Sequence, residues 1–263
     1  MTPAEGPVPT RWRLLQHGAA HGAFNMGVDE ALLASAIAGT TTLRFYRWDG
    51  PWLSLGYAQK LDSQRVAACD GAGVGIVRRV SGGRAVLHGC DLTYCVAAPE
   101  AVLPEGLLGS YQVVADALIA GLQSLGVAAV RTPSPRRATS ASDFDCFAAP
   151  AQEEICAMGR KLVGSAQRRM RGGVLQHGSI RLTPDPPEVT GAVGFTPGVA
   201  TSLAELGVRA QTDELQEALK TAFRRVLGAA LDESVLSPGE LRSAERRLAA
   251  HRGSLAARGR IPA

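Results

Sequence analysis

The chain of 263 residues is long enough to bury a full hydrophobic core, and its 46% hydrophobic and 20% charged residues are typical of a soluble globular protein. No run approaches the roughly 18 apolar residues that a membrane-spanning helix needs, so no membrane association is expected. The net charge of +4 is mild and the arginines are dispersed, so the sequence does not favour nucleic acid, and an acidic protein partner fits the charge equally well.

Cysteine usage and the first residues indicate a reducing compartment. The five cysteines are odd in number, irregularly spaced and free of any CxxC pair, which argues against a disulfide framework and against a zinc site. Residues 1–10 are rich in proline and glycine, lack the apolar core of a secretory signal and are expected to be disordered. We therefore expect a cytoplasmic protein.

The first ordered elements should be a helix followed by two strands. Apolar residues at helical spacing predict a helix over residues 25–37, with Asn25 as its N-cap. Alternating residues predict strands over 42–48 and 52–57, and residues 63–69 suit a short helix.

A glycine pair then joins two further predicted strands, residues 74–80 and 85–88. A strand, a Gly82-Gly83 turn and a second strand expose backbone N–H groups that can hold an anion or a ligand carbonyl. Arg79 and Arg84 would add positive charge there. A plain hairpin turn is the alternative, because a glycine pair alone is weak evidence for a site.

The middle of the chain leads to a cysteine. Residues 91–97 read as a strand, and residues 108–125 have the apolar spacing of a core helix that ends at Gly126. A polar loop over 131–143 then delivers the chain to Cys146, and a cysteine at the end of such a loop is suited to reactivity.

A second predicted hairpin, residues 159–180, surrounds a lysine with glycine. Gly159 and Gly164 flank Lys161, and glycine in a strand often marks a close approach of a ligand or another backbone. A lysine that is buried there shifts its pKa readily. An ordinary solvated lysine on a surface hairpin is the alternative.

The last elements complete an α+β fold. Residues 213–227 and 238–251 predict two helices. Strands and helices do not follow a clean βαβ order, which favours α+β, with mixed β-sheets flanked by helices, over a doubly wound sheet.

Three separated motifs resemble one superfamily. Residues 78–88 (RRVSGGRAVLH), 159–167 (GRKLVGSAQ) and 175–180 (LQHGSI) are similar to those of the lipoate/biotin protein ligase superfamily, and residues 25–30 and 45–56 match its N-terminal pattern. The resemblance implies a mixed α+β catalytic domain related to class II aminoacyl-tRNA synthetases. We expect one such domain over residues 11–252, between a disordered N-terminus and a flexible tail at 253–263.

Within the superfamily, three features resemble the LipM-type octanoyltransferases rather than the ATP-dependent ligases. Arg84 stands where ligases usually have a third glycine, and Cys146-Phe147 with Glu154 resembles the nucleophile region of the transferases. We also expect no accessory C-terminal domain, which many ligases have. Two positions depart from the family pattern: Gly89 replaces an acidic residue, and Cys95 brings a second thiol near the site.

The resemblance implies a transfer of octanoyl from octanoyl-acyl carrier protein, through a cysteine thioester, to a lysine of a lipoyl domain. Cys146 would be the nucleophile and Lys161 the proton carrier, with Val80 and Val163 in the acyl tunnel. The residues expected to bind substrate are Arg79, Ser81, Gly82, Gly83, Arg84, His88, Gly164, Ser165, Ala166, His177 and Gly178.

No cofactor and no metal are implied. The expected acceptors are lipoyl domains of 2-oxoacid dehydrogenase E2 subunits or the glycine cleavage H protein. The alternatives are an ATP-dependent lipoate or biotin ligase, with lipoyl-AMP as the lipoate ligase intermediate and Arg79 and Arg84 on phosphate, and a non-catalytic module that binds an acyl or cofactor carrier.

Overall fold

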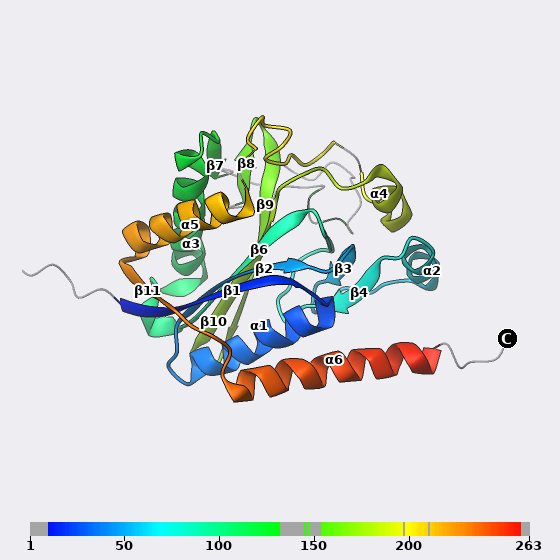
Figure 1. Cartoon of the computed structure of the whole chain (residues 1–263), viewed down its shortest axis with the longest axis horizontal. Helices are drawn as coiled ribbons and strands as arrows, with labels where there is room; N and C mark the ends of the chain where they lie inside the picture. Colours follow the sequence, from blue (N-terminus) through cyan, green and yellow to red (C-terminus); the bar gives the residue numbers. More distant parts are fainter. Residues whose placement is uncertain are drawn as a thin grey trace, which may run out of the picture.

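Two β-sheets of unequal size, with helices around them, form the fold (Figure 1). The structure is a computed structural model that describes residues 10–131, 145, 147, 154–196, 198–209 and 211–258, without the side chains of 252–258. Cys146 lies outside the described residues, as do most of the predicted polar loop and both ends of the chain.

The larger sheet has eight strands in the order β11-β1-β2-β6-β10-β9-β8-β7. They are β1 (Thr10–Ala20), β2 (Thr42–Trp48), β6 (Asp91–Pro99), β7 (Ala129–Arg131), β8 (Ile155–Ala157), β9 (Arg160–Met170), β10 (Gly173–Arg181) and β11 (Ala229–Glu233). β1 is parallel to both of its neighbours, and every other pair is antiparallel. This mixed pairing confirms the predicted α+β class.

The smaller sheet corrects one prediction. Its order is β4-β3-β5, formed by β3 (Trp52–Leu55), β4 (Gly75–Arg78) and β5 (Val86–His88). β4 runs parallel to β3 and β5 runs antiparallel to it, so β4 and β5 do not pair with each other. The Gly82-Gly83 segment is therefore not a hairpin turn. It is a loop that crosses the end of β3, because β3 lies between the two strands that the loop connects.

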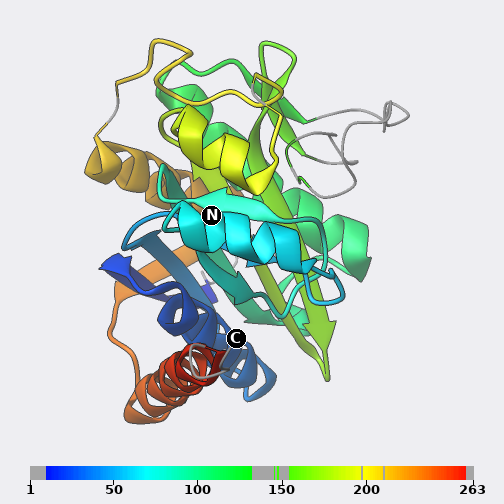
Figure 2. The same cartoon turned by 90° about the vertical axis from the view of Figure 1, so that its right-hand side faces the viewer.

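The helices pack against both sheets. They are α1 (Gly22–Ile37), α2 (Ser63–Gly71), α3 (Gly106–Ser124), α4 (Pro187–Val193), α5 (Thr212–Leu227) and α6 (Pro238–Arg258), with a 3-10 turn over Glu100–Val102. Helices α1, α3, α5 and α6 lie on the two faces of the larger sheet, and α2 and α4 pack beside the smaller one. α3 and α5 pack on one face, and α1 lies on the other with α6 outside it (Figure 2). α6 continues past the predicted end at residue 251.

Glycines allow both helix pairs to approach closely. A Cβ atom on Gly27 would lie 2.8 Å from the Cα of Ala244, where α1 meets α6. A Cβ on Gly121 would lie 3.1 Å from the Cα of Leu219, where α3 meets α5. Both distances are too short for an alanine without movement of a backbone.

The start of α1 also differs from its prediction. The helix begins at Gly22, where the His21 side chain caps it, so Asn25 is not the N-cap. Asn25 lies inside the first turn, and its Nδ2 donates to the carbonyls of Ala20 and Arg47. α1 is buried nearly all round, which leaves no polar face to mark its beginning.

The predicted β9–β10 hairpin is confirmed, and its turn lies one residue before the pair Gly172-Gly173. Met170 pairs with Gly173, so Arg171 and Gly172 form the two-residue turn, with φ of 52° and 80°. Positive φ at both central residues is the type I′ pattern that suits the twist of a hairpin.

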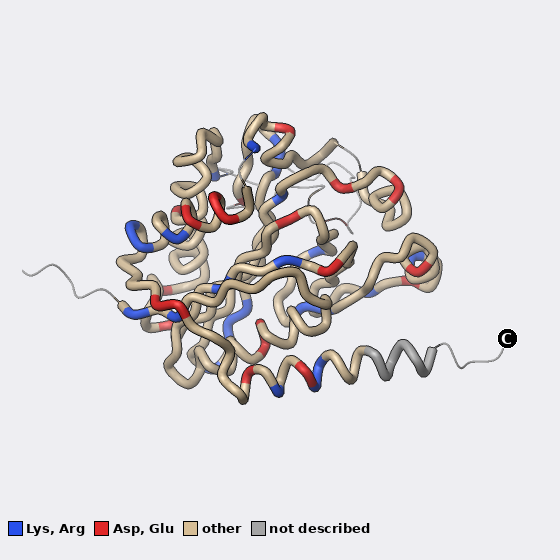
Figure 3. Tube along the Cα trace, viewed as in Figure 1, with Lys and Arg blue, Asp and Glu red and all other residues tan. Residues whose placement is uncertain are grey.

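Charge is spread over the fold. Lysines and arginines alternate with acidic residues along the described trace without a long run of one sign (Figure 3). Among the described residues, no helix has the length and apolar character to cross a membrane.

Candidate active site

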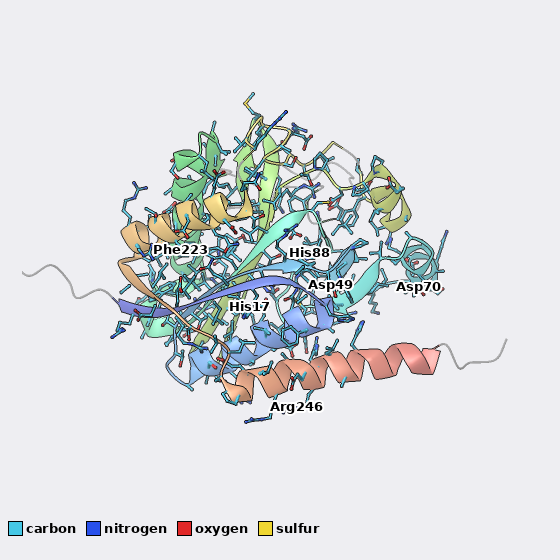
Figure 4. The ribbon with its side chains drawn as sticks, viewed as in Figure 1. His17, Asp49, Asp70, His88, Phe223 and Arg246 are labelled. Carbon is cyan, nitrogen blue, oxygen red and sulfur yellow. The ribbon has the colours of Figure 1, made fainter. Side chains whose placement is uncertain are left out.

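A largely apolar pocket lies between the two sheets. The larger sheet supplies one wall from β2, β6, β9 and β10, and the smaller sheet with the Gly82-Gly83 loop supplies the other. The lining residues are Met26, Tyr46, Trp48, Ser54, Arg79, Gly83, Val86, His88, Thr93, Gly164, Ser165, Ala166, His177, Gly178 and Ser179. His88 is inside the molecule, whereas Arg246 points outward from α6 (Figure 4).

Four lining residues form one row across the larger sheet. Gly164 on β9 is opposite Ser179 on β10, Ser179 is opposite Thr93 on β6, and Thr93 is opposite Tyr46 on β2. Directly opposite residues project to the same face of a sheet. The row spans three strand spacings, about 14 Å, so the pocket wall runs across the strands from Gly164 to Tyr46.

Lys161 lies beside the Gly164 end of this row. It is 2% exposed, forms an ion pair with the buried carboxylate of Glu154, and its Nζ lies 4.8 Å from the centre of the Phe147 ring. A Cβ on Gly164 would lie 3.3 Å from Nζ. The alternative of a solvated surface lysine is therefore wrong, and glycine at 164 leaves the space between the lysine and the pocket open.

A first chain of hydrogen bonds crosses the interior from Asp29 to Ser81. His177 Nδ1 is 2.8 Å from Asp29 Oδ2, and His177 Nε2 is 2.6 Å from Ser81 Oγ. Burial acts to raise the pKa of the Asp29 carboxyl, but the hydrogen bond from His177 and the charge of Arg44 lower it overall. An ionised carboxylate only accepts, so Nδ1 carries the proton and Nε2 accepts from the serine.

Arg44 and Tyr46 complete this cluster. The buried Arg44 guanidinium donates to Asp29 Oδ1 at 2.7 Å and to Asn25 Oδ1 at 2.7 Å, and Tyr46 donates its hydroxyl to Asp29 Oδ2 at 2.9 Å. Burial lowers the pKa of His177, an effect that Asp29 opposes in part. The cluster thus presents a neutral imidazole to the pocket with both charges behind it.

A second chain of the same kind runs from Asp91 to Ser54. His88 Nδ1 is 2.8 Å from Asp91 Oδ2, and His88 Nε2 is 2.8 Å from Ser54 Oγ. The His88 ring stacks on Trp48, with centroids 4.0 Å apart. Burial acts to raise the pKa of Asp91, but His88 and the Gly89 N–H lower it overall. Gly89 stands where the family pattern has an acidic residue, and Asp91, two positions later, provides a carboxylate that contacts His88.

The Gly82-Gly83 loop is held from inside by Arg79. Its guanidinium donates to the carbonyls of Ser54, Gly82 and Arg84 at 2.6, 3.0 and 2.9 Å. Gly83 has a φ of 90°, and a Cβ on Gly56 would lie 1.9 Å from the Gly83 carbonyl oxygen. The loop thus needs glycine at 83 for its conformation and at 56 for its close approach.

The sequence and the fold were compared with known proteins. Residues 21–224 match the family described as the lipoyl protein ligase A/B catalytic domain. This match covers more than half of the chain. The chain belongs to this family.

Relatives of the lipoyl protein ligase A/B family agree with that assignment. A protein of Kyrpidia tusciae named Octanoyltransferase LipM is 38% identical over 90% of this chain and 93% of its own length. A protein of the same name from Symbiobacterium thermophilum is 36% identical over 90% and 92%. These relatives match nearly from end to end.

Solved structures show the same fold. Lipoate-protein ligase A bound with ATP superposes with a TM-score of 0.76 at 21% identity, covering 90% of this chain and 94% of that one. The bi-partite lipoate protein ligase of Thermoplasma acidophilum has a TM-score of 0.70 at 20% identity, covering 90% and 91%. The predicted catalytic-domain fold is confirmed.

Most of the residues predicted to bind substrate come together. The ones that line the pocket are Arg79, Gly83, His88, Gly164, Ser165, Ala166, His177 and Gly178. Ser81, Gly82 and Arg84 lie behind the lining: Ser81 holds His177, and the carbonyls of Gly82 and Arg84 hold Arg79. Val80 and Val163, expected in an acyl tunnel, are not among the lining residues.

Sequence reasoning missed much of the wall of this family site. Met26, Trp48, Ser54, Thr93 and Ser179 line the pocket but were not predicted to bind substrate. All but Thr93 lie within segments that resemble the family, but nothing along the sequence distinguishes them from the neighbours that face elsewhere.

The described thiols differ in their surroundings. Cys95 is fully buried, and burial together with its contact to Asp29 raises its pKa well above the usual value, so it stays protonated. Cys156 lies on β8 directly opposite Lys161 and is 7% exposed. Its position beside Lys161 makes Cys156 the alternative nucleophile among the described thiols. Among the described residues, no group of acidic, histidine or cysteine side chains could hold a metal ion.

Proposed function

We propose that this chain is an octanoyltransferase that moves octanoyl from octanoyl-acyl carrier protein to a lysine of a lipoyl domain, the first step of protein lipoylation. The observation that carries the proposal is a buried lysine at one end of an apolar pocket, in a chain whose relatives over 90% of its length are named octanoyltransferases. Its location in the cytoplasm stays a prediction from the sequence.

The first half of the reaction transfers the acyl group to the enzyme. The Cys146 thiolate attacks the thioester carbonyl, a C–S bond forms to the enzyme, and the C–S bond to the carrier breaks with release of its thiolate. Two contacts support this role. Asp145 pairs with Ala85 beside the Gly82-Gly83 loop, and the Phe147 ring lies at Lys161, so the residues on either side of Cys146 border the site.

The second half transfers the acyl group to the acceptor. The lysine amine of the lipoyl domain attacks the enzyme thioester, a C–N bond forms, and the enzyme thiolate leaves. The Lys161 ammonium gives its proton to the carrier thiolate that leaves in the first half, so its neutral Nζ can now take the proton that the acceptor amine loses, and Glu154 holds Nζ in position. Arginine cannot exchange this proton, because it stays charged in proteins.

The pocket suits the acyl chain. Its lining is mainly apolar, its two histidines are bound to carboxylates on the side away from the pocket, and the row from Gly164 to Tyr46 gives a straight path of about 14 Å across the strands. The carbonyl end would lie at Gly164, next to Lys161, and the methyl end would lie toward Tyr46 and Trp48.

An ATP-dependent lipoate ligase acting through lipoyl-AMP is the second candidate. The solved ligases share the fold at 20–21% identity, which supports the architecture but not the reaction. The relatives of higher identity support transfer instead. The two reactions differ in one requirement, which is ATP.

The test is a transfer assay without nucleotide. The protein is incubated with octanoyl-carrier protein and an apo lipoyl domain, and the domain is weighed by mass spectrometry. We expect octanoylation without ATP and no reaction with free octanoate. Strict dependence on ATP and a free acid would instead support the ligase.

The same assay identifies the nucleophile. With the acceptor left out, peptide mapping should find one octanoyl thioester, on Cys146. Cys146→Ser should abolish transfer, Cys156→Ser should retain it, and Lys161→Arg should lower turnover by about 10²–10⁴-fold. A thioester on Cys156, across from Lys161, would reassign the role.

A further inference from the structure

One buried hydroxyl on the pocket wall takes no part in the two hydrogen-bonded chains. Ser179 lines the pocket and is 2% exposed, yet its Oγ makes no hydrogen bond within the described part of the chain. The Asp91 carboxylate lies nearby, and this hydroxyl helps to lower its pKa. Asp91 already accepts from His88, Thr93 and the Gly89 N–H.

The other hydroxyls around the pocket are occupied. Ser54 contacts His88 and Arg79, Ser81 contacts His177, Thr93 contacts Trp48 and Asp91, and Ser165 contacts Tyr94. A buried hydroxyl without a partner destabilises a fold, because it loses its bonds to water. The pocket itself therefore offers the reason for keeping a serine at position 179.

Ser179 lies at the reactive end of the pocket. It is the cross-strand partner of Gly164, and Cβ positions in such pairs are about 4.5–5.5 Å apart. The Cβ position of Gly164 is in turn 3.3 Å from Lys161 Nζ. The hydroxyl and the ammonium group thus face the same small volume, which is where an acyl carbonyl must lie to react.

We propose that the Ser179 hydroxyl donates a hydrogen bond to the acyl carbonyl oxygen and stabilises the oxyanion that forms when the thiolate attacks. This inference rests on the proposed octanoyl transfer. No proton is transferred: the hydroxyl holds the negative oxygen while the new C–S bond forms, and the oxygen returns to a carbonyl as the carrier thiolate leaves. In the second half of the reaction the same bond stabilises the oxyanion formed by the amine.

The test compares Ser179→Ala with the wild-type protein. We expect kcat to fall about 100-fold or more, as for the loss of one oxyanion donor, with little change in KM. Binding of free octanoate, measured by calorimetry, should be unchanged, because the interaction strengthens only as the oxyanion forms. The thermal midpoint should stay the same or rise, because an unsatisfied hydroxyl has been removed.

A matched control comes from the same sheet. Thr42 on β2 also has a buried hydroxyl without a partner among the described residues, but it does not line the pocket. Thr42→Val should keep kcat unchanged. Near-normal kcat in Ser179→Ala, or an equal loss of octanoate affinity and of rate, would overturn the assignment. An inactive wild-type protein would count against the proposed function instead.

Discussion

The two histidines of the pocket make the same kinds of hydrogen bond, but the aspartates that hold them have different partners. His177 and His88 each use Nδ1 on an aspartate and Nε2 on a serine. Behind His177, Asp29 is also bonded to a fully buried arginine and a tyrosine. Behind His88, Asp91 is bonded to Thr93 and a backbone N–H, with Trp48 stacked on the ring.

This difference suggests separate roles for the two aspartates, one in the stability of the fold and one in the width of the pocket. The Asp29 cluster joins α1, β2 and β10, so it connects the helix to the centre of the larger sheet. The Asp91 chain joins β6 to the smaller sheet, where Arg79 donates to Ser54 Oγ, but in the described part of the chain no arginine or lysine pairs with the Asp91 carboxylate itself. We infer that the first cluster carries stability and that the second sets the spacing of the pocket walls.

The largest effect is expected for Asp29→Asn. The substitution leaves the buried Arg44 charge without its carboxylate, and removal of one partner of a buried ion pair costs about 3–5 kcal/mol. Urea denaturation measures the loss in the free energy of unfolding. A loss below that of Asp91→Asn would contradict the comparison.

A smaller effect is expected for Asp91→Asn. The asparagine oxygen can still accept hydrogen bonds, and its amide can donate to His88 Nδ1 if the imidazole changes tautomer. The cost should be about 1–3 kcal/mol, the range for a buried group with an unsatisfied partner. Because the other tautomer reverses the bond to Ser54, the KM for octanoyl-carrier protein should rise while the fold persists. An unchanged KM would count against a role in pocket spacing.

Acid is expected to destabilise the fold through His17 and His177, the two histidines near Asp29. Burial first, and then the charge of Arg44, lower the pKa of His17 to about 4, and burial lowers that of His177. Both rings are neutral when folded, whereas the unfolded chain takes up protons below a pKa of about 6.5. The free energy of unfolding should therefore fall as the pH drops from about 6.5 to about 4.

The test of this smallest effect is a pair of urea titrations at about pH 7 and about pH 5. His17→Gln keeps an acceptor for Arg44 Nε but removes the titrating ring, so its stability should depend less on pH. An equal pH dependence in the variant would show that the protons bind elsewhere.

Much of the fold was predictable because its signals are local. α5 has a strong apolar face and a capping box at Gln211 and Glu214, and β2 was predicted with its observed bounds. β1 was missed, because its buried and exposed residues do not alternate. The β4–β3–β5 order was also missed, since two strands joined by a glycine pair look like a hairpin and only packing reveals the strand between them.

The site was predictable only where its residues are consecutive. The motifs around Gly83, Lys161 and His177 drew attention to both pocket walls, and the role of Cys146 stays a prediction. The partners of those residues come from far along the chain: Asp29 is 148 positions from His177, and Ser81 is 96. Spacing along a sequence carries no information about such contacts. Ser179 was missed because its importance depends on an absent hydrogen bond.

The pocket lies along a seam between two separate sheets, and this has an evolutionary consequence. Among the described strands no backbone ladder joins the walls, so the gap depends on side chains such as the Trp48–His88 stack. Substitutions at the seam can widen or narrow the gap while both ladders keep their register. A scaffold of this kind can change the acyl group that it accepts through a few point mutations, without passing through unfolded intermediates.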